Sequence, residues 1–412
     1  MRRRVVVTGM GTVNPIAKSV PDYWEALLSG KSGIAPITLF NHEAFKVHFG
    51  GEVKEWDAEQ FMDGKTARRL DRFAQFAYAA ADQALKDSGI KIAQEDPFRC
   101  GVIVGSGIGG ISELEEQHER YLNKGGPSRI SPFVVPKMIA NSASGVISIQ
   151  YGLMGPSTAV STACATSNHA ITDAFHTICW DLADVMISGG AEAGITPMGL
   201  GGFVSAKALS ERNESPTTAS RPFDRDRDGF VLSEGAGIVV LEEYEHARAR
   251  GAKIYAEILG AGNTADAFHI TQPHPEGLGA CKSMEIALRS AKLNVDQIDY
   301  INAHGTSTQL GDIAETKAIK QTFGSHASRL AVSSTKSMIG HLLGASGGVE
   351  LIATILSINH GVIHPTINLD DQDPECDLDY VPNKPRQATI RYALSNSFGF
   401  GGHNCTLAIG SI

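Results

Sequence analysis

The sequence lacks the features that mark exported, membrane-spanning and nucleic-acid-binding proteins. No apolar run approaches the roughly 20 residues that cross a bilayer, and the three valines at 5–7 are too short a run for a signal peptide. Six cysteines occur without any CxxC spacing, which argues against a zinc site and against a disulfide framework. Acidic residues outnumber basic ones by 45 to 36, whereas nucleic-acid phosphates demand a basic face. We therefore expect a cytoplasmic globular protein with free thiols and with no membrane or nucleic-acid partner.

The chain has 412 residues, which is more than one hydrophobic core usually serves, so two similar halves are expected. Short apolar runs at 100–106, 183–190, 237–243 and 253–260 predict strands, and helical patterns lie between them. This alternation predicts an α/β fold in which helices cover both faces of a sheet. We place the boundary between the halves after residue 255, so that they comprise residues 1–255 and 256–412.

Three local patterns add detail to this fold. Residues 19–30 predict a short helix capped by Ser19, and apolar residues at helical spacing predict one amphipathic helix over 66–88, closed by Gly89. The segments 157–178 and 330–356 share a pattern of strand, small-residue turn and helix. Their similarity indicates a duplicated α/β unit.

A glycine motif in the sequence resembles a dinucleotide-binding loop without its full signature. Gly105, Gly107 and Gly110 stand in GxGxxG register directly after a predicted strand. The acidic residue expected about 20 positions later is missing. We therefore interpret the motif as a glycine turn beside a pocket.

A second motif resembles a calcium-binding loop. Asp224, Asp226 and Asp228 have EF-hand spacing, but position twelve is a glycine, Gly235, where a bidentate glutamate is required. We expect these acids to pair with the three neighbouring arginines and to fix a loop. Those arginines are Arg221, Arg225 and Arg227.

One cysteine has a setting that differs from the other five. Cys164 is flanked by serine, threonine and alanine, and it precedes a predicted helix whose packed face includes Ala170, Ala174 and Ile178. A helix N-terminus favours a thiolate, so Cys164 is a candidate nucleophile. The alternative is a small buried hydrophobe, which is our interpretation of Cys100, Cys179, Cys281, Cys376 and Cys405.

Two of the fourteen histidines stand out as candidate partners for this thiol. His304 and His341 each follow a predicted strand or short apolar run and enter a glycine-containing turn. A buried nucleophile needs donors for an oxyanion and groups that handle charge, and an imidazole can supply both. A satisfied core histidine is the alternative for each.

Four separated motifs carry a family resemblance. They are TAC ending at Cys164, NAHGTST with His304, STKSMIGHLLGASG with Lys336 and His341, and SNSFGFGG with Phe398 and Phe400. In this order they resemble the β-ketoacyl-acyl-carrier-protein synthases of type II fatty acid synthesis, in particular the elongating class, over nearly the whole chain. The resemblance implies a thiolase-like fold, five layered as αβαβα from two similar halves, usually as a homodimer. We expect no cofactor, and we assign no metal ligands.

The resemblance also implies roles for individual residues in a decarboxylative Claisen condensation. Cys164 would hold the acyl chain as a thioester, and backbone N–H groups of Cys164 and Phe400 would form the oxyanion hole. Two neutral imidazoles, His304 and His341, would stabilise the enolate left when malonyl-acyl carrier protein loses CO2. Lys336 would order the site, with Glu350 as its ion partner.

Further residues are implied in binding. Ile108 and Phe203 would line the acyl tunnel, Phe400 would gate it, and Thr306 and Thr308 would bind the pantetheine arm. The remaining substrate contacts would come from Thr271 and Phe398. Acyl carrier protein is acidic, so cations should surround the tunnel mouth. The implied patch comprises Lys65, Arg68, Arg69, Arg129 and Lys207.

The sequence departs from the common family pattern at two positions, and it leaves two alternatives open. Gln309 stands where the family commonly has proline, and His403 stands where it has threonine. A polyketide ketosynthase shares these motifs. A non-catalytic subunit like the chain-length factors keeps the fold but typically replaces the nucleophile, so Cys164 argues against it.

Overall fold

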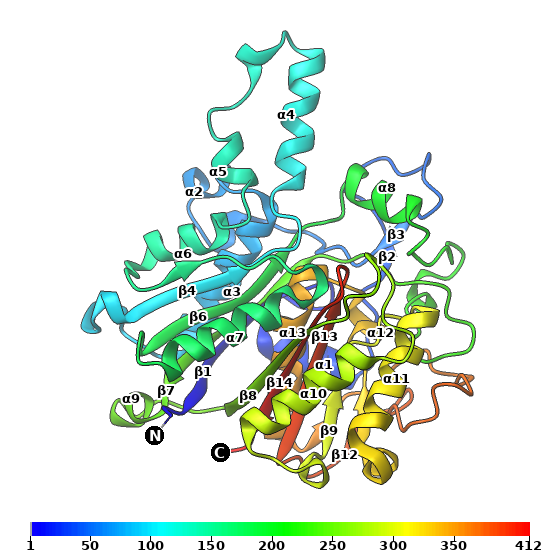
Figure 1. The fold of residues 1–412 in the computed structure, drawn as a ribbon. Coiled ribbons are helices and arrows are strands. Elements are labelled where there is room, and N and C mark those ends of the chain that lie inside the picture. The colour runs from blue at the N-terminus through cyan, green and yellow to red at the C-terminus, as the bar shows by residue number, and fades with distance from the viewer. Residues whose placement is uncertain (1) are drawn as a thin grey trace.

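Ten strands form one continuous sheet in the computed structural model, which describes residues 2–412 (Figure 1). The strands of the N-terminal half are β1 (Val5–Val13), β4 (Cys100–Gly105), β5 (Ser157–Thr158), β6 (Val185–Glu192) and β7 (Gly235–Glu243). Those of the C-terminal half are β8 (Ala256–Ala265), β9 (Tyr300–Asn302), β10 (Ala331–Ser333), β13 (Tyr392–Gly399) and β14 (His403–Gly410). The four strands predicted from apolar runs correspond to β4, β6, β7 and β8.

The two halves of the sheet have the same strand order. The N-terminal half runs β1-β7-β6-β4-β5 and the C-terminal half runs β8-β14-β13-β9-β10. In each half the first two contacts are antiparallel and the last two are parallel. The halves join where residues 5–7 of β1 pair with β8. This repeated topology confirms the duplicated unit expected from the sequence.

Helices pack on both sides of the sheet and between its halves, which gives five layers. The outer layers are formed by α3 (Arg72–Ser88) and α6 (Ser142–Tyr151) on one side and by α10 (Leu278–Ala291) and α11 (Gln309–Phe323) on the other. The middle layer is formed by α7 (Thr166–Cys179) and α13 (Ser346–His360), which contact each other and strands of both halves. Every residue of α13 from Ser346 to Ile358 is buried. The expected thiolase-like αβαβα architecture is confirmed.

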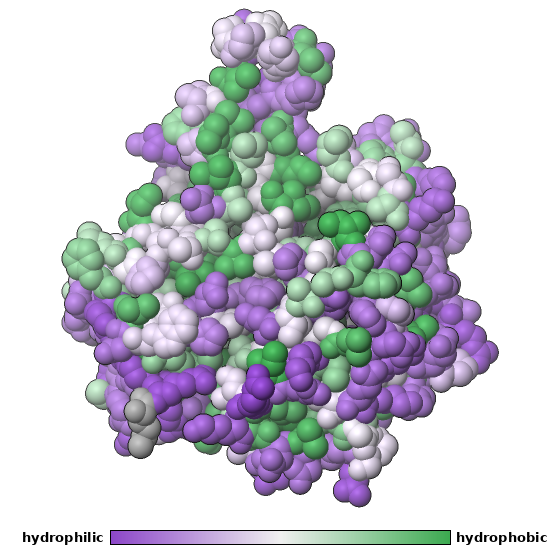
Figure 2. All heavy atoms as spheres, in the orientation of Figure 1, coloured by the Kyte–Doolittle hydropathy of each residue, from purple (hydrophilic) through white to green (hydrophobic). Residues whose placement is uncertain are grey.

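A helical hairpin projects from this layered body. It contains α4 (Ile111–Asn123) and α5 (Val134–Met138), at the top of Figure 1. Several of its apolar side chains are exposed, among them Leu122 and Val135, and Figure 2 shows this apolar surface.

The remaining elements are short. They are α1 (Val20–Leu28), α2 (Gly64–Arg68), α8 (Pro197–Ser205), α9 (Tyr244–Ala249), α12 (Lys336–Ile339) and the small strands β2 (Ala35–Pro36), β3 (Phe49–Gly50), β11 (Val362–Ile363) and β12 (Arg386–Gln387). Ser19 caps α1 as predicted, by accepting the N–H of Asp22. None of the helices described within residues 2–412 combines the length and the hydropathy that crossing a bilayer requires.

The prediction of one helix over 66–88 is wrong at its N-terminal end. Two helices occur there, α2 and α3, and the second begins only after Asp71. The Asp71 carboxylate accepts the N–H of Phe73 and also the hydroxyl of Ser112, so it caps α3 and anchors the start of α4. The apolar spacing continues across the break, which is why periodicity alone did not reveal it. The predicted end at Gly89 is confirmed, with φ of 63°.

We propose that the junction between the halves lies at residues 255 and 256. This point follows α9 and immediately precedes β8, the first strand of the second copy.

Candidate active site

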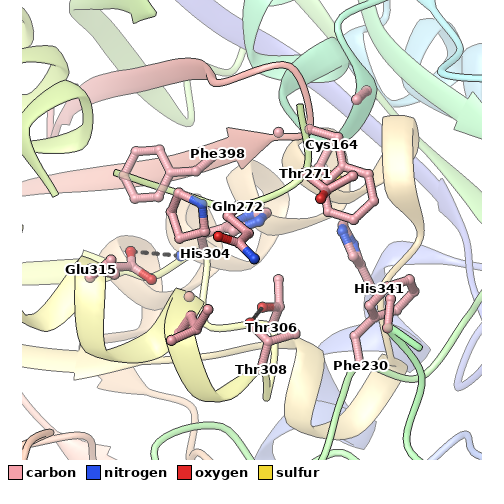
Figure 3. Close-up of a pocket in the computed structure, with 18 of the residues that line it drawn as sticks. Cys164, Phe230, Thr271, Gln272, His304, Thr306, Thr308, Glu315, His341 and Phe398 are labelled. Carbon is pink, nitrogen blue, oxygen red and sulfur yellow. Dashed lines mark hydrogen bonds between the residues drawn. The ribbon is translucent and has the colours of Figure 1, made fainter. Parts of the chain in front are cut away.

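A cavity of about 520 Å³ opens between the two halves of the molecule (Figure 3). Its wall brings together Ile108, Cys164, Phe203, Lys207 and Phe230 from the N-terminal half and Thr271, His304, Thr306, Thr308, His341, Phe398 and Phe400 from the C-terminal half. Such a concave site, largely apolar with a few convergent polar groups, is where a small substrate is usually bound.

Cys164 lies in the turn that leads into α7. The turn is a short 3-10 helix, Ala163–Ala165, so the thiol is at the N-terminus of a buried helix as the sequence predicts. Ala163 has φ of 49°, a conformation that costs a non-glycine residue on the order of 1 kcal/mol and that turns the chain sharply here. The corresponding turn of the second half, Leu343–Ala345, repeats it with φ of 48° at Leu343.

The three candidate catalytic side chains converge on one point. The sulfur of Cys164 and one ring nitrogen each from His304 and His341 lie within 4.8 Å of one another, and all three residues are buried. The imidazole centroids are 5.5 Å apart and the rings are nearly perpendicular. The geometry therefore allows both rings to contact a group bound to Cys164.

Hydrogen bonds fix the tautomer of each imidazole. Nδ1 of His341 accepts the N–H of Leu343 at 3.3 Å and lies 2.9 Å from the hydroxyl of Ser346. Nδ1 of His304 lies 3.4 Å from the Lys336 ammonium, which can only donate. In the neutral rings the proton must therefore be on Nε2. Each Nε2–H is thus available as a donor in the cavity.

Burial keeps both rings neutral. It lowers the pKa of His304 and of His341 well below the ordinary histidine value, and the positive charge of Lys336 lowers both further. No helix N-terminus is needed to explain the neutrality of His341, because burial and Lys336 both favour the uncharged ring.

The same burial contradicts the expectation of a resting thiolate. The pKa of Cys164 is raised to about 11 because the side chain is buried, although Lys336 and the backbone N–H groups of Phe400 and Cys164 act in the opposite direction. The thiol is therefore protonated at neutral pH. The helix N-terminus is present, but its effect is smaller than the cost of desolvating the anion.

The backbone N–H groups that lower the pKa of Cys164 also mark a position where an anion can bind. The N–H groups of Cys164 and Phe400 both face the sulfur. Gly399 brings the Phe400 loop close, because a Cβ at Gly399 would lie 2.9 Å from the carbonyl of Thr162 and 3.0 Å from the nitrogen of Cys164. Two backbone donors beside a thiol are suited to bind a negatively charged oxygen.

Lys336 is buried behind His304. Its ammonium donates to the carbonyl of His304 at 2.7 Å and to Glu350 at 2.5 Å. Burial raises the pKa of Glu350 above its ordinary value even though the cation lies beside it. The predicted contact between Lys336 and Glu350 is present, and it places a positive charge directly behind an imidazole.

All the residues expected to bind substrate line the cavity. Of the five cations expected to bind a partner, only Lys207 lines it. Lys207 lies in the cavity wall and is exposed. Three other members of the expected patch, Lys65, Arg68 and Arg69, lie in or directly after α2, and Arg129 lies near the tip of the hairpin. These four are exposed but are not part of the cavity wall. The binding roles of both groups stay predictions.

Two buried carboxylates were missed by the sequence analysis. Glu315 of α11 accepts the N–H groups of His304 and Gly305 at 2.9 and 2.8 Å and so fixes the histidine turn. Its position on the apolar face of α11, between Ala314 and Ile319, is a signal that could have been found.

The second missed carboxylate occupies the glycine turn after β4. Glu192 accepts the N–H groups of Gly107 and Ile108, the hydroxyl of Ser106 and the N–H of Gly344. These are the donors that a dinucleotide phosphate would otherwise occupy. The interpretation as a glycine turn beside a pocket is therefore confirmed.

The acidic loop that resembles an EF-hand is fixed by arginines, but mostly not the expected pairs. Arg221 binds Asp224 at 2.9 Å as predicted. Arg227 instead reaches Asp373 at 2.7 Å and Asp312 at 3.3 Å. The prediction was wrong here because Arg227 is buried and binds acids that the fold brings from distant segments. Of the others, Arg225 pairs with Asp371 and Asp228 with Arg212.

The cysteine and the two imidazoles also have the composition of a soft-metal site. Metal binding would require the Nε2 lone pairs, but the partners of both Nδ1 atoms place protons on Nε2. The two imidazoles are therefore in the tautomer that donates hydrogen bonds into the cavity, and this tautomer does not suit a metal.

Comparison with known proteins identifies the family. The model of the β-ketoacyl synthase N-terminal domain matches residues 2–247, and that of the C-terminal domain matches residues 255–370. The chain belongs to the β-ketoacyl synthase family. Among curated β-ketoacyl synthases, a 3-oxoacyl-acyl-carrier-protein synthase 2 from Synechocystis sp. is 54% identical over 99% of this chain and 98% of its own. One of the same name from Staphylococcus aureus is 51% identical over 98% and 97%.

Solved β-ketoacyl synthase structures have the same fold. A type II polyketide ketosynthase bound to its acyl-carrier protein superposes with a TM-score of 0.94 at 35% identity, with both chains fully covered. A β-ketoacyl synthase from Burkholderia phymatum gives a TM-score of 0.93 at 35% identity, again over both whole chains.

Proposed function

We propose that this β-ketoacyl synthase is an elongating condensing enzyme of fatty acid synthesis. It joins an acyl group from acyl-acyl carrier protein to malonyl-acyl carrier protein, releasing CO2 and forming β-ketoacyl-acyl carrier protein. The observation that carries the proposal is the convergence of Cys164, two Nε2–H donors and two backbone N–H groups on one cavity. The curated relatives at 50% identity or more bear the name of synthase 2, whereas the polyketide ketosynthase is 35% identical, which favours the fatty acid reaction.

In the first half-reaction the sulfur of Cys164 attacks the thioester carbonyl carbon. The oxyanion that forms is bound by the N–H groups of Cys164 and Phe400. When the bond from carbon to the pantetheine sulfur breaks, the proton of the thiol ends on that sulfur. The acyl group is left on Cys164, and its chain is sheltered by apolar side chains of the cavity such as Ile108 and Phe203.

In the second half-reaction the malonyl carboxylate leaves as CO2, and its bonding electrons move into an enolate. The Nε2–H groups of His304 and His341 donate to the enolate oxygen. Because both rings are neutral, they stabilise this charge without readily protonating the carbanion. The carbanion then attacks the acyl carbonyl, the bond to Cys164 breaks, and the thiolate takes up a proton.

The partner we propose is acyl carrier protein, which would deliver its pantetheine arm past Thr306 and Thr308. One of the solved relatives is a ketosynthase in complex with an acyl-carrier protein, which supports this partner. Exposed Lys207 at the cavity mouth would meet the acidic surface of the carrier.

We also propose a homodimer in the cytoplasm. The sheet ends at β5, whose two residues are exposed, and the nearby apolar side chains of Ile149 and Met154 are 84% and 61% exposed. An open strand edge beside apolar surface favours pairing with a second copy. Size-exclusion chromatography with light scattering should give twice the mass of one chain, and a monomer would contradict this part of the proposal.

The decisive experiment is mass spectrometry of the protein after incubation with acyl-acyl carrier protein. We expect an acyl adduct confined to the peptide that carries Cys164, and β-ketoacyl product once malonyl-acyl carrier protein is added. The Cys164→Ala variant should form no adduct. An adduct on another cysteine, or none on the wild-type protein, would refute the proposed function.

A further inference from the structure

His403 has no part in the reaction described above, yet it lies in the hairpin that carries Phe400. It begins β14 and pairs with Gly399 across the hairpin whose loop contains Phe400. The ring lies against Gly401, because a Cβ on that glycine would be 3.1 Å from the ring atoms Cδ2 and Nε2. His403 therefore packs against the loop that carries Phe400.

A second histidine, His169, faces this ring from α7. The two ring centroids are 6.4 Å apart with an interplanar angle of 87°, which is the edge-to-face arrangement that aromatic rings favour. Nδ1 of His169 is 2.9 Å from the hydroxyl of Thr162, two residues before the nucleophile. The pair therefore connects the Phe400 hairpin to the turn of Cys164.

The two strands of the hairpin thus contact the nucleophile turn in different ways. On the β13 side, Gly399 approaches the backbone of Thr162 and Cys164 directly. On the β14 side, a side-chain contact is added, which runs from His403 through His169 to Thr162. Phe400, which supplies the oxyanion N–H, lies between the two contacts.

Burial favours the neutral form of His169. The pKa of His169 is lowered to about 4 by its burial and by the neighbouring His403. The histidine–carboxylate salt bridges within residues 2–412 both belong to His246, so neither ring of the pair has an acid as partner there. Two acids lie on the neighbouring elements. Asp173 is one turn further along α7 from His169, and Asp266 follows the β8 residue that pairs with His403.

We propose that His403 and His169 are positioning residues that hold the Phe400 N–H in place beside Cys164. The inference rests on the proposed function, because it assigns the pair to the acylation half-reaction. It gives a role to His403, the position at which this chain departs from the family's common threonine.

The test is single-turnover acylation of Cys164 by an acyl-pantetheine thioester, which needs no carrier docking. The alkylation of Cys164 by iodoacetamide is measured in parallel, because it needs the thiolate but forms no tetrahedral oxyanion, so a displaced Phe400 N–H affects it only through the stability of the thiolate. We expect His403→Ala to slow acylation about 10- to 100-fold, as a displaced catalytic group does, and to change alkylation much less. His403→Phe keeps the ring contact and should restore most of the acylation rate.

Two further variants and a local measurement complete the test. If the pair acts as a unit, adding His169→Ala to His403→Ala should cost less than the product of the two single effects. His118→Ala, an exposed histidine of α4, is the matched control. Hydrogen exchange in the loop at residues 400–402 should be faster in His403→Ala and unchanged in the control.

Several results would overturn the inference. It is wrong if His403→Ala leaves acylation and loop exchange unchanged, if alkylation falls as much as acylation, or if the phenylalanine variant behaves like the alanine variant. Failure of the wild-type protein to form any adduct would instead refute the proposed function, and the exchange measurement would then decide the structural role of the pair.

Discussion

The two imidazoles of the cavity have the same charge and the same tautomer, although different neighbours orient them. His341 is oriented by a backbone N–H and a serine hydroxyl, whereas His304 is oriented by a lysine. Both end as neutral rings with the proton on the nitrogen that faces the cavity. The sequence motifs pointed to the two histidines and to Lys336, but not to the backbone N–H and the serine hydroxyl at His341, because these partners depend on the turn geometry.

Removing one imidazole should separate the two half-reactions. We expect His304→Ala to lower the rate of condensation by about 100- to 1000-fold, which is the typical cost of one lost oxyanion donor. Acylation of Cys164 should fall much less, since its oxyanion is bound by backbone N–H groups. Single-turnover assays measure the two steps, acylation with acyl-acyl carrier protein alone and condensation after malonyl-acyl carrier protein is added to the preformed acyl-enzyme, and an equal loss in both would contradict the assignment.

The raised pKa of Cys164 predicts how its reactivity depends on pH. Because the thiolate is the reactive form, alkylation by iodoacetamide should accelerate about tenfold per pH unit and level off only near pH 11. Lys336 stabilises the thiolate, so Lys336→Met should slow alkylation at a fixed pH below that value. A wild-type profile that levels off near pH 7 would show that the thiolate is the resting form after all.

At the scale of elements, one carboxylate joins three segments that are far apart in the sequence. Glu192 ends β6 and accepts hydrogen bonds from the turn between β4 and α4 and from Gly344 in the turn before α13. The turn at 105–110 carries Ile108 into the cavity, and the other turn follows His341. Glu192 therefore connects the apolar wall of the cavity with one of its imidazoles.

Substituting Glu192 should reveal this connection as a loss of stability. Glu192→Ala leaves the buried N–H of Gly344 and the part-buried N–H groups of Gly107 and Ile108 without an acceptor, so we expect the free energy of unfolding to fall by about 1 to 3 kcal/mol. Glu192→Gln retains one acceptor oxygen and should cost less. Denaturant titration measures both, with Glu119→Ala on the exposed face of α4 as the control, expected within about 0.5 kcal/mol.

Elements with local signals could be predicted from the sequence, and elements fixed by distant contacts could not. The strands at β4, β6, β7 and β8 and the cap at Ser19 followed from apolar runs and from one side chain. The break before α3 was missed because the apolar spacing runs through it. Likewise Arg227 was assigned to its sequence neighbours, although its buried guanidinium binds Asp312 and Asp373.

At the scale of the whole molecule, the proposed partner is acidic, whereas the chain itself has a net charge of −9. We expect the double variant Arg68→Glu with Arg129→Glu to raise KM for substrate bound to acyl carrier protein, because both side chains are exposed cations. The KM for a short pantetheine thioester should not change. Both values come from steady-state kinetics, and equal effects on the two substrates would show that the patch does not bind the carrier.

The turn that repeats in the two halves carries a cysteine in the first half and a glycine in the second. The position that corresponds to Cys164 in the second half is Gly344, in a turn of the same backbone shape. A side chain there would meet the Gly107 nitrogen at 2.5 Å and the Glu192 carboxylate at 2.7 Å. Grafting a cysteine onto Gly344 would therefore disrupt the packing and yield no second nucleophile. The two turns keep the same backbone conformation, but only the first carries a cysteine. The second turn, which has no side chain at Gly344, instead packs closely against Gly107 and Glu192 of the half that contains Cys164.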